Sequence, residues 1–180
     1  MKAMKNLFTI LFLSFFCSVF AQVAIGKQSV ASPSVSLDFG SANRGMILPW
    51  ATSASAVTSV VNGTMIYDLS DKKIKVKYNS GWKDLSIDTS GTTVDPVTSV
   101  DGVTIQNPVT ELAGAKVAVG TPSAAPGILV LEDTNKAMVL PKVSSPHLNI
   151  INPAPGMMVY DTNSKQLAVY NGKVWTFWKQ

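Results

Sequence analysis

Short segments in which apolar and polar residues alternate strictly occur along the chain. In residues 73–78, Ile74, Val76 and Tyr78 alternate with three lysines, and residues 34–39 alternate in the same way. This period of two predicts β-strands with one buried face. Compact apolar runs or further alternation predict more strands at residues 45–48, 64–67, 82–85, 127–131, 137–140, 157–160, 166–170 and 174–178.

Four blocks of sequence occur twice in the same order. The blocks are V-A-I-G at 23–26 and V-A-V-G at 117–120; R-G-M-I-L-P at 44–49 and K-A-M-V-L-P at 136–141; G-T-M-I-Y-D at 63–68 and G-M-M-V-Y-D at 156–161; and Y-N-S-G-W at 78–82 and Y-N-G-K-V-W at 170–175. The constant order and the nearly constant offset favour a tandem duplication. Glycine, proline, aliphatic and aromatic residues dominate the shared positions, so the repeat encodes architecture and not chemistry.

We therefore expect an all-β fold made of two similar small antiparallel modules in tandem, at residues 22–86 and 117–180, each with one short helix at most. Residues 87–116 would connect them as a hairpin, because two apolar stretches flank Asp101-Gly102, a favoured hairpin turn. A module of about 60 residues buries little surface by itself. The modules should therefore pack on each other or on other chains.

The N-terminus indicates export. Lysines precede an apolar run at residues 7–20, and Ala21 lies where a signal peptidase cleaves, so residues 1–21 are interpreted as a signal peptide. The run is shorter than the ~20 residues that cross a bilayer, so no transmembrane segment is expected after cleavage. The residues before Cys17 do not fit a lipoprotein signal. We expect the cell surface or the extracellular space, with the periplasm as the alternative.

Composition narrows the chemistry. The net charge of +4 includes two lysines of the signal peptide, which leaves 13 basic against 11 acidic residues, or +2. The only cysteine, Cys17, is also removed, so the mature chain has no disulfide and no cysteine-based metal site. No cofactor and no metal are expected. Lysines cluster without aromatic interleaving, which argues against a nucleic-acid partner and is typical of a protected edge strand; they are Lys72, Lys73, Lys75, Lys77 and Lys83.

Candidate catalytic residues are few, and we predict that the chain is not an enzyme. His147 is the only histidine, and no G-x-S-x-G nucleophile motif occurs. Asp68 and Asp161 occupy matching positions. Each is placed to begin a turn, and the weaker alternative is a pair of hydrolytic carboxylates.

We expect two matching hairpins, which join residues 73–78 to 82–85 and residues 166–170 to 174–178. Aromatic residues near these hairpins are the candidate binding residues. They are Tyr78, Trp82, Tyr170, Trp175 and Trp178. Exposed Tyr and Trp side chains are frequent in binding surfaces, whereas the same residues in a small β-module often belong to the core. A carbohydrate-binding module that uses Trp82 and Trp175 is therefore the competing hypothesis.

Taken together, the repeated blocks resemble a group of exported surface and tail-fibre-like repeat proteins of Bacteroidetes-type bacteria. The resemblance covers both sets of blocks listed above, with Ala137 in place of a glycine and Ser80 inserted before Gly81. It implies a structural or adhesion role at the cell envelope or surface, exercised as a homo-oligomer with a trimer as the first expectation, and a surface protein or glycan as a possible partner. It supplies no catalytic residues.

Overall fold

The computed structural model describes residues 22–87, 90–110, 112 and 114–179, so the predicted signal peptide with Cys17 lies outside the described residues. Strands dominate these residues, which confirms the all-β prediction. The strands are β1 (Val23–Ile25), β2 (Val35–Phe39), β3 (Met46–Ile47), β4 (Trp50–Ala51), β5 (Met65–Asp68), β6 (Lys73–Tyr78), β7 (Gly81–Asp84), β8 (Val117–Val119), β9 (Leu129–Leu131), β10 (Ala137–Met138), β11 (Lys142–Val143), β12 (Met157–Asp161), β13 (Gln166–Tyr170) and β14 (Trp175–Trp178). The helical elements are η1 (Ala54–Ala56), α2 (Gly102–Gln106) and α3 (Pro146–Asn149).

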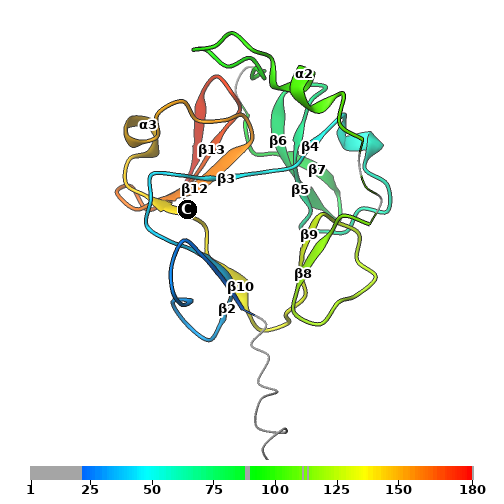
Figure 1. The fold of residues 1–180 in the computed structure, drawn as a ribbon, viewed down its shortest axis with the longest axis vertical. Helices are drawn as coiled ribbons and strands as arrows, with labels where there is room; N and C mark the ends of the chain where they lie inside the picture. The colour runs from blue at the N-terminus through cyan, green and yellow to red at the C-terminus, as the bar shows by residue number, and fades with distance from the viewer. Residues whose placement is uncertain (1–21, 88–89, 111, 113, 180) are drawn as a thin grey trace, which may run out of the picture.

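Two larger sheets and two smaller sheets organise the chain. One larger sheet has the strand order β4-β5-β6-β7 and the other has the order β11-β12-β13-β14. The small sheets are β1-β2-β10 and β8-β9. In Figure 1 the larger sheets lie at the top and the small sheets lie below them.

Residues 22–86, the first half, and residues 117–180, the second half, use the same strand pairing. β4 lies parallel to β5 with Trp50 opposite Tyr67, and β11 lies parallel to β12 with Lys142 opposite Tyr160. The strand pairs β5-β6 and β12-β13 are antiparallel, and so are the predicted hairpins β6-β7 (the first hairpin) and β13-β14 (the second hairpin). The parallel pairs β1-β2, β8-β9, β4-β5 and β11-β12 were not predicted, because the pattern within a strand of two to five residues does not identify its partner or its direction.

The register corrects one sequence correspondence. Trp82 lies opposite Lys77 in the first hairpin, and Trp175 lies opposite Tyr170 in the second. Four residues are enclosed in each case, so the structural counterpart of Tyr170 is Lys77 and not Tyr78. The repeated letters Y-N therefore lie one position out of step in the two turns.

The connecting segment also differs from the prediction. Residues 103–105 belong to α2 and do not form the returning strand of a hairpin. The cause is Asp101, whose carboxylate accepts the backbone N–H of Val103 at 3.1 Å and caps the helix. Each half contains one short helical element, η1 or α3, in agreement with the one short helix at most that is expected in each module. Within the described residues, no helix has the length and apolar character needed to span a membrane.

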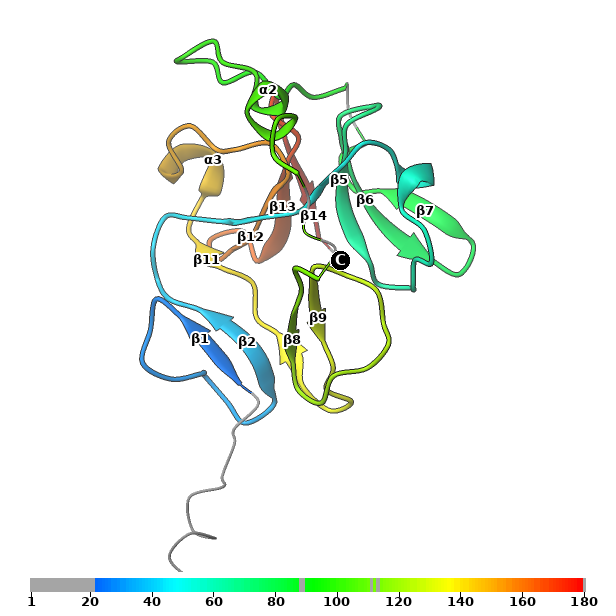
Figure 2. The same ribbon diagram turned by 45° about the vertical axis from the view of Figure 1, so that its right-hand side comes forward.

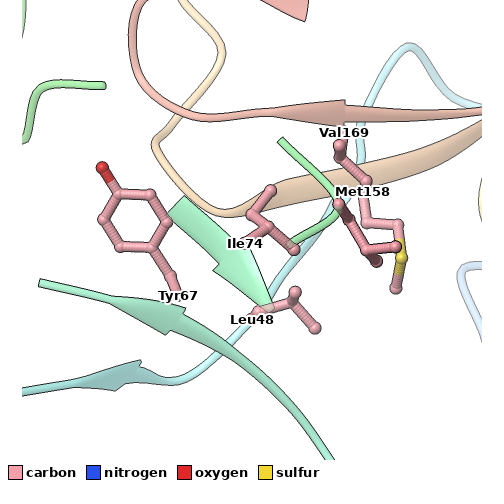
Figure 3. Close-up of a cluster of buried hydrophobic side chains, with 6 residues drawn as sticks. Leu48, Tyr67, Ile74, Met158 and Val169 are labelled. Carbon is pink, nitrogen blue, oxygen red and sulfur yellow. The ribbon is translucent and has the colours of Figure 1, made fainter. Parts of the chain in front are cut away.

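A single hydrophobic cluster contains residues of both halves. Leu48, Tyr67 and Ile74 of the first half pack with Met158 and Val169 of the second (Figure 3). All five are at most 5% exposed. The first half therefore does not complete its own core, as the small size of each module led us to expect.

Candidate functional site

Aromatic side chains form a row on the outer face of the second hairpin. The rings of Tyr170 and Trp175 are 5.2 Å apart, those of Trp175 and Phe177 are 6.5 Å apart and stacked, and Phe177 meets His147 of α3 edge-on at 5.7 Å. Residues two apart on a strand share a face, which aligns Trp175 with Phe177. Tyr170 and Trp175 also pack on a second buried cluster around Val159 and Ala168. This aromatic row (Tyr170, Trp175, Phe177 and His147) combines a buried base with a partly exposed surface.

The row includes two residues that the sequence analysis did not select. Phe177 was missed because only tyrosine and tryptophan residues were selected, and its counterpart by register is Asp84. His147 was considered only as a catalytic residue. The available signal was the spacing of two between Trp175 and Phe177.

Trp178, in contrast, lies on the opposite face and joins the two halves. Its indole Nε1–H donates to the carbonyl of Leu85 at 2.6 Å. The ammonium of Lys83 lies 5.2 Å from the centre of the Trp178 ring, within the range of a cation–π contact. Its role in the structure is therefore attachment of the second hairpin to the first.

Tyr78 and Trp82 lie at the far end of the first hairpin. Tyr78 is 49% exposed, and Trp82 is half-buried. Tyr78 pairs with Gly81, so the next residue, Trp82, projects to the other face of the sheet. The structure thus brings together only Tyr170 and Trp175 among the five candidate binding residues, and ligand binding by all five stays a prediction.

Two of the five clustered lysines, Lys73 and Lys75, are paired with carboxylates. Lys75 forms ion pairs with Asp68 at 2.9 Å and with Asp71, and Lys73 forms one with Asp84 at 3.2 Å. Burial alone would lower the pKa of Lys75, but the two aspartates raise it above its usual value. The edge-strand interpretation is wrong for Lys73, Lys75 and Lys77, because β6 lies between β5 and β7 inside its sheet, whereas Lys83 lies on the edge strand β7. These ion pairs neutralise the charges of Lys73 and Lys75 within the sheet.

Asp68 is a buried carboxylate at the end of β5 that fixes the following turn. It accepts the backbone N–H and the hydroxyl of Ser70 at 2.8 and 2.6 Å, and the N–H of Ala54 at 2.9 Å. Burial would raise the pKa of Asp68, but these donors and Lys75 lower it to about 2. These hydrogen bonds confirm the turn interpretation for this residue.

Asp161 performs the same task in the second half without a cation. It accepts the backbone N–H groups of Ser145 at 3.0 Å and Asn163 at 2.9 Å. Burial again opposes ionisation, and the backbone donors together with Gln166 hold the pKa of Asp161 below its usual value. Each aspartate therefore links its turn to the chain segment that follows β4 or β11.

The contact between the halves is an exchange of strands. β3 of the first half pairs with β12 of the second, and β10 of the second half extends the sheet of β1 and β2. The N–H of Leu48 donates to Gly156 at 3.0 Å. Figure 2 shows the strand segments of one half lying beside the sheets of the other.

Buried polar groups reinforce this contact. The hydroxyl of Tyr67 donates to the carbonyl of Asn171 at 2.9 Å, and the indole of Trp50 donates to Pro155 at 3.0 Å. Burial, followed by the charge of Asp71, raises the pKa of Tyr67, so this hydroxyl remains a donor. Buried donors that lose their acceptors cost more than the bond itself contributes, so these pairs favour one relative placement of the halves.

No metal site accompanies these features in the part of the chain that the structure describes: no group of three or more His, Cys, Asp or Glu residues could hold an ion there.

Comparison with known families gives one match. Residues 117–180 match the phage tail like trimerisation region, and neither the curated proteins nor the solved structures contain a match to the chain. The matched region corresponds to β8 to β14, the whole of the second half. The match supports, at this coarse level, a structural, tail-fibre-like and homo-oligomeric protein.

Proposed function

We propose that this chain is an exported, non-enzymatic structural or adhesion protein of the cell envelope or surface, and that it acts as a homo-oligomer. The match of residues 117–180 to a trimerisation region is the observation that carries the proposal. The predicted signal peptide and the repeated blocks support the location and the fibre-like character.

The geometry supports a mechanical role. The two halves exchange strands and share one core, so force applied to either half is resisted by backbone hydrogen bonds of both. Among the described residues, Asp68 and Asp161, the strongest candidates for acid–base chemistry, are occupied by turn N–H donors. These carboxylates therefore serve the fold, and in the proposed role the protein acts through a rigid surface and requires no reactive group.

Two measurements test the proposal. Light scattering on the purified mature chain at micromolar concentration should give the mass of several chains, with three as the expected number. A monomer whose unfolding is independent of protein concentration would contradict it. Protease treatment of intact cells should degrade the mature chain, and complete protection until the outer membrane is opened would instead indicate a periplasmic protein.

The alternative function, carbohydrate binding, is favoured by the aromatic row. Its rings present a partly exposed apolar face, with Phe177 37% exposed. The first half lacks such a row, because Lys75 and Lys77 stand opposite Asp84 and Trp82 there. Binding on a glycan array that is lost in Trp175→Ala but retained in Trp82→Ala, both folded by circular dichroism, would favour this function. Equal glycan binding by both variants would exclude the row as the binding site.

A further inference from the structure

The repeated Leu-Pro segments, residues 44–49 and 136–141, pair through opposite edges in the two halves. In the first segment, Met46 lies opposite Met158, and the N–H of Leu48 donates to Gly156. In the second segment, the N–H groups of Ala137 and Val139 donate to the carbonyls of Ser34 and Leu37, each at 2.9 Å. Met138 is the counterpart of Met46, so the two segments use alternate residues for pairing.

Alternate residues of an extended chain direct their backbone groups to opposite edges. The edge of residues 45 and 47 therefore faces away from β12 in the first half, and the edge of residues 138 and 140 faces away from β2 in the second. No strand of the described residues pairs with either of these edges. Each Leu-Pro segment is thus a strand with one edge paired and one edge open.

The sheets that would receive these open edges are also incomplete. β10 covers one edge of β2, whereas the corresponding edge of β9 has no partner among the described strands. Leu37 of β2 is 2% exposed, whereas its counterpart Leu129 of β9 is 42% exposed. Ile47, on the open edge of the first segment, is 52% exposed.

The same asymmetry exists between β12 and its counterpart β5. β3 pairs with the start of β12, but no described strand pairs with the start of β5. A Cβ added to Gly156 would lie 3.1 Å from the Cβ of Tyr67, whereas a Cβ added to its counterpart Gly63 would have nothing within 4 Å. The N–H of Tyr67 donates to the carbonyl of Pro49, so Tyr67 directs its backbone toward the edge of β5 on which β4 lies. Met65, two residues earlier, directs its backbone toward the same edge, and no described strand pairs with that edge at Met65.

We propose that these edges bind a second copy of this chain by repeating the contact that joins the two halves. Residues 45–47 of one copy pair with β9 of the next, and residues 138–140 of that next copy pair with the start of β5 of the first. Each junction between two copies thus pairs all four open edges, which are those of residues 45–47, β9, residues 138–140 and the start of β5. Two of these edges come from each copy. The arrangement is heterologous, so copies join head to tail and close into a ring when the rotation permits. The inference rests on the proposed homo-oligomer and identifies the strands that build it.

A charge on the receiving strand tests the assignment. Leu129→Lys places an ammonium where the neighbouring copy would lie, and the exposure of Leu129 lets the isolated chain fold. We expect the oligomer mass to fall to that of one chain at micromolar concentration, with an unchanged circular dichroism spectrum. Ile151→Lys is the matched control, because Ile151 is 85% exposed and lies outside all four edges, and it should keep the oligomer. An oligomer that survives Leu129→Lys overturns the inference.

Cross-linking between two preparations tests the register. Met138 lies opposite Leu37 within the chain, so Met46 of one copy should lie opposite Leu129 of the next. Neighbouring strands are 4.7–4.9 Å apart, within the range for a disulfide, and the mature chain has no other cysteine. Met46→Cys and Leu129→Cys chains, refolded together from urea and oxidised, should give a covalent two-chain product, whereas Ile151→Cys with Leu129→Cys should not.

The outcomes separate this inference from the proposed function. A wild-type monomer contradicts both. A wild-type oligomer without the specific cross-link, or one that is indifferent to Leu129→Lys, retains the homo-oligomer and overturns the strand assignment. A cross-linked assembly of two chains retains the strand assignment and contradicts the trimer.

Discussion

Replacing Asp68 by asparagine should destabilise the protein strongly at neutral pH and less at acidic pH. The pKa of Asp68 is lowered to about 2 by Ser70, Lys75 and Ala54, against an unfolded value of roughly 3.9. The difference of about 1.9 pKa units corresponds to roughly 2.5 kcal/mol at ~1.36 kcal/mol per unit. Because Asp68 is only 1% exposed, solvent screening reduces this figure little.

The sign of the pH dependence follows from the lowered pKa. The folded state prefers the ionised carboxylate, so the contribution is fully present above the unfolded pKa and is lost as the pH falls through about 2. At pH 3 roughly half of it should remain. Asp68→Asn should therefore reduce the free energy of unfolding by about 2–3 kcal/mol at pH 7 and by about half as much at pH 3.

Urea denaturation monitored by circular dichroism at both pH values measures these differences. Asp84→Asn is the matched control on the same sheet: Asp84 is 35% exposed, and exposed ion pairs contribute about 0–1 kcal/mol. Asp161→Asn should show the same pH trend, since backbone donors also lower the pKa of Asp161. A loss in Asp68→Asn that is equal at pH 7 and pH 3 would refute the reasoning, because the carboxylate charge would then not be its source.

Two further predictions concern the contact between the halves and its surroundings. Tyr67→Phe removes the 2.9 Å hydroxyl donor to a buried carbonyl and should cost about 1–3 kcal/mol in urea denaturation, while Tyr78→Phe on the exposed hairpin end should cost less than about 0.5 kcal/mol. Gly172→Ala would place a Cβ 1.8 Å from the carbonyl oxygen of Thr92 at a φ of +94°, so it should destabilise by about 1–3 kcal/mol more than Gly81→Ala. Gly81 has a φ of +131° and open space around it; equal thermal midpoints of the two glycine variants would show that the backbone near residue 92 moves freely.

Local patterns predicted the hairpins well. The alternation at residues 73–78 and the largely apolar stretch at residues 166–170 predict β6 and β13 with their observed bounds, because such patterns are properties of each strand and its own sheet. The buried turn aspartates, Asp68 and Asp161, were also correctly interpreted. Helix α2 was not predicted, because Asp101 is equally suited to begin a turn and to cap a helix.

The candidate site was predicted only in part, and for a similar reason. Sequence comparison between the repeats selected residues by shared letters, which grouped Tyr78 with Tyr170 although the register places Tyr170 with Lys77. The face on which a side chain lies depends on pairing partners, and a shift of one residue reverses it. Trp178 therefore belongs to the contact between the halves, and Phe177 belongs to the aromatic row.

The strand exchange could not be predicted from local sequence, and it is the feature on which the proposed assembly depends. The Leu-Pro segments have nearly the same sequence, yet Met46 pairs across to β12 while Ala137 and Val139 pair back to β2. The six similar residues of the two segments do not determine which strand each one pairs with. The partner is therefore set by the half in which the segment lies: the segment of the first half pairs with the second half, and the segment of the second half pairs with the first. A segment with a neighbour on both sides would use both edges. Because each of the two Leu-Pro segments leaves one edge without a partner among the described strands, these open edges are the reason to expect assembly with further copies.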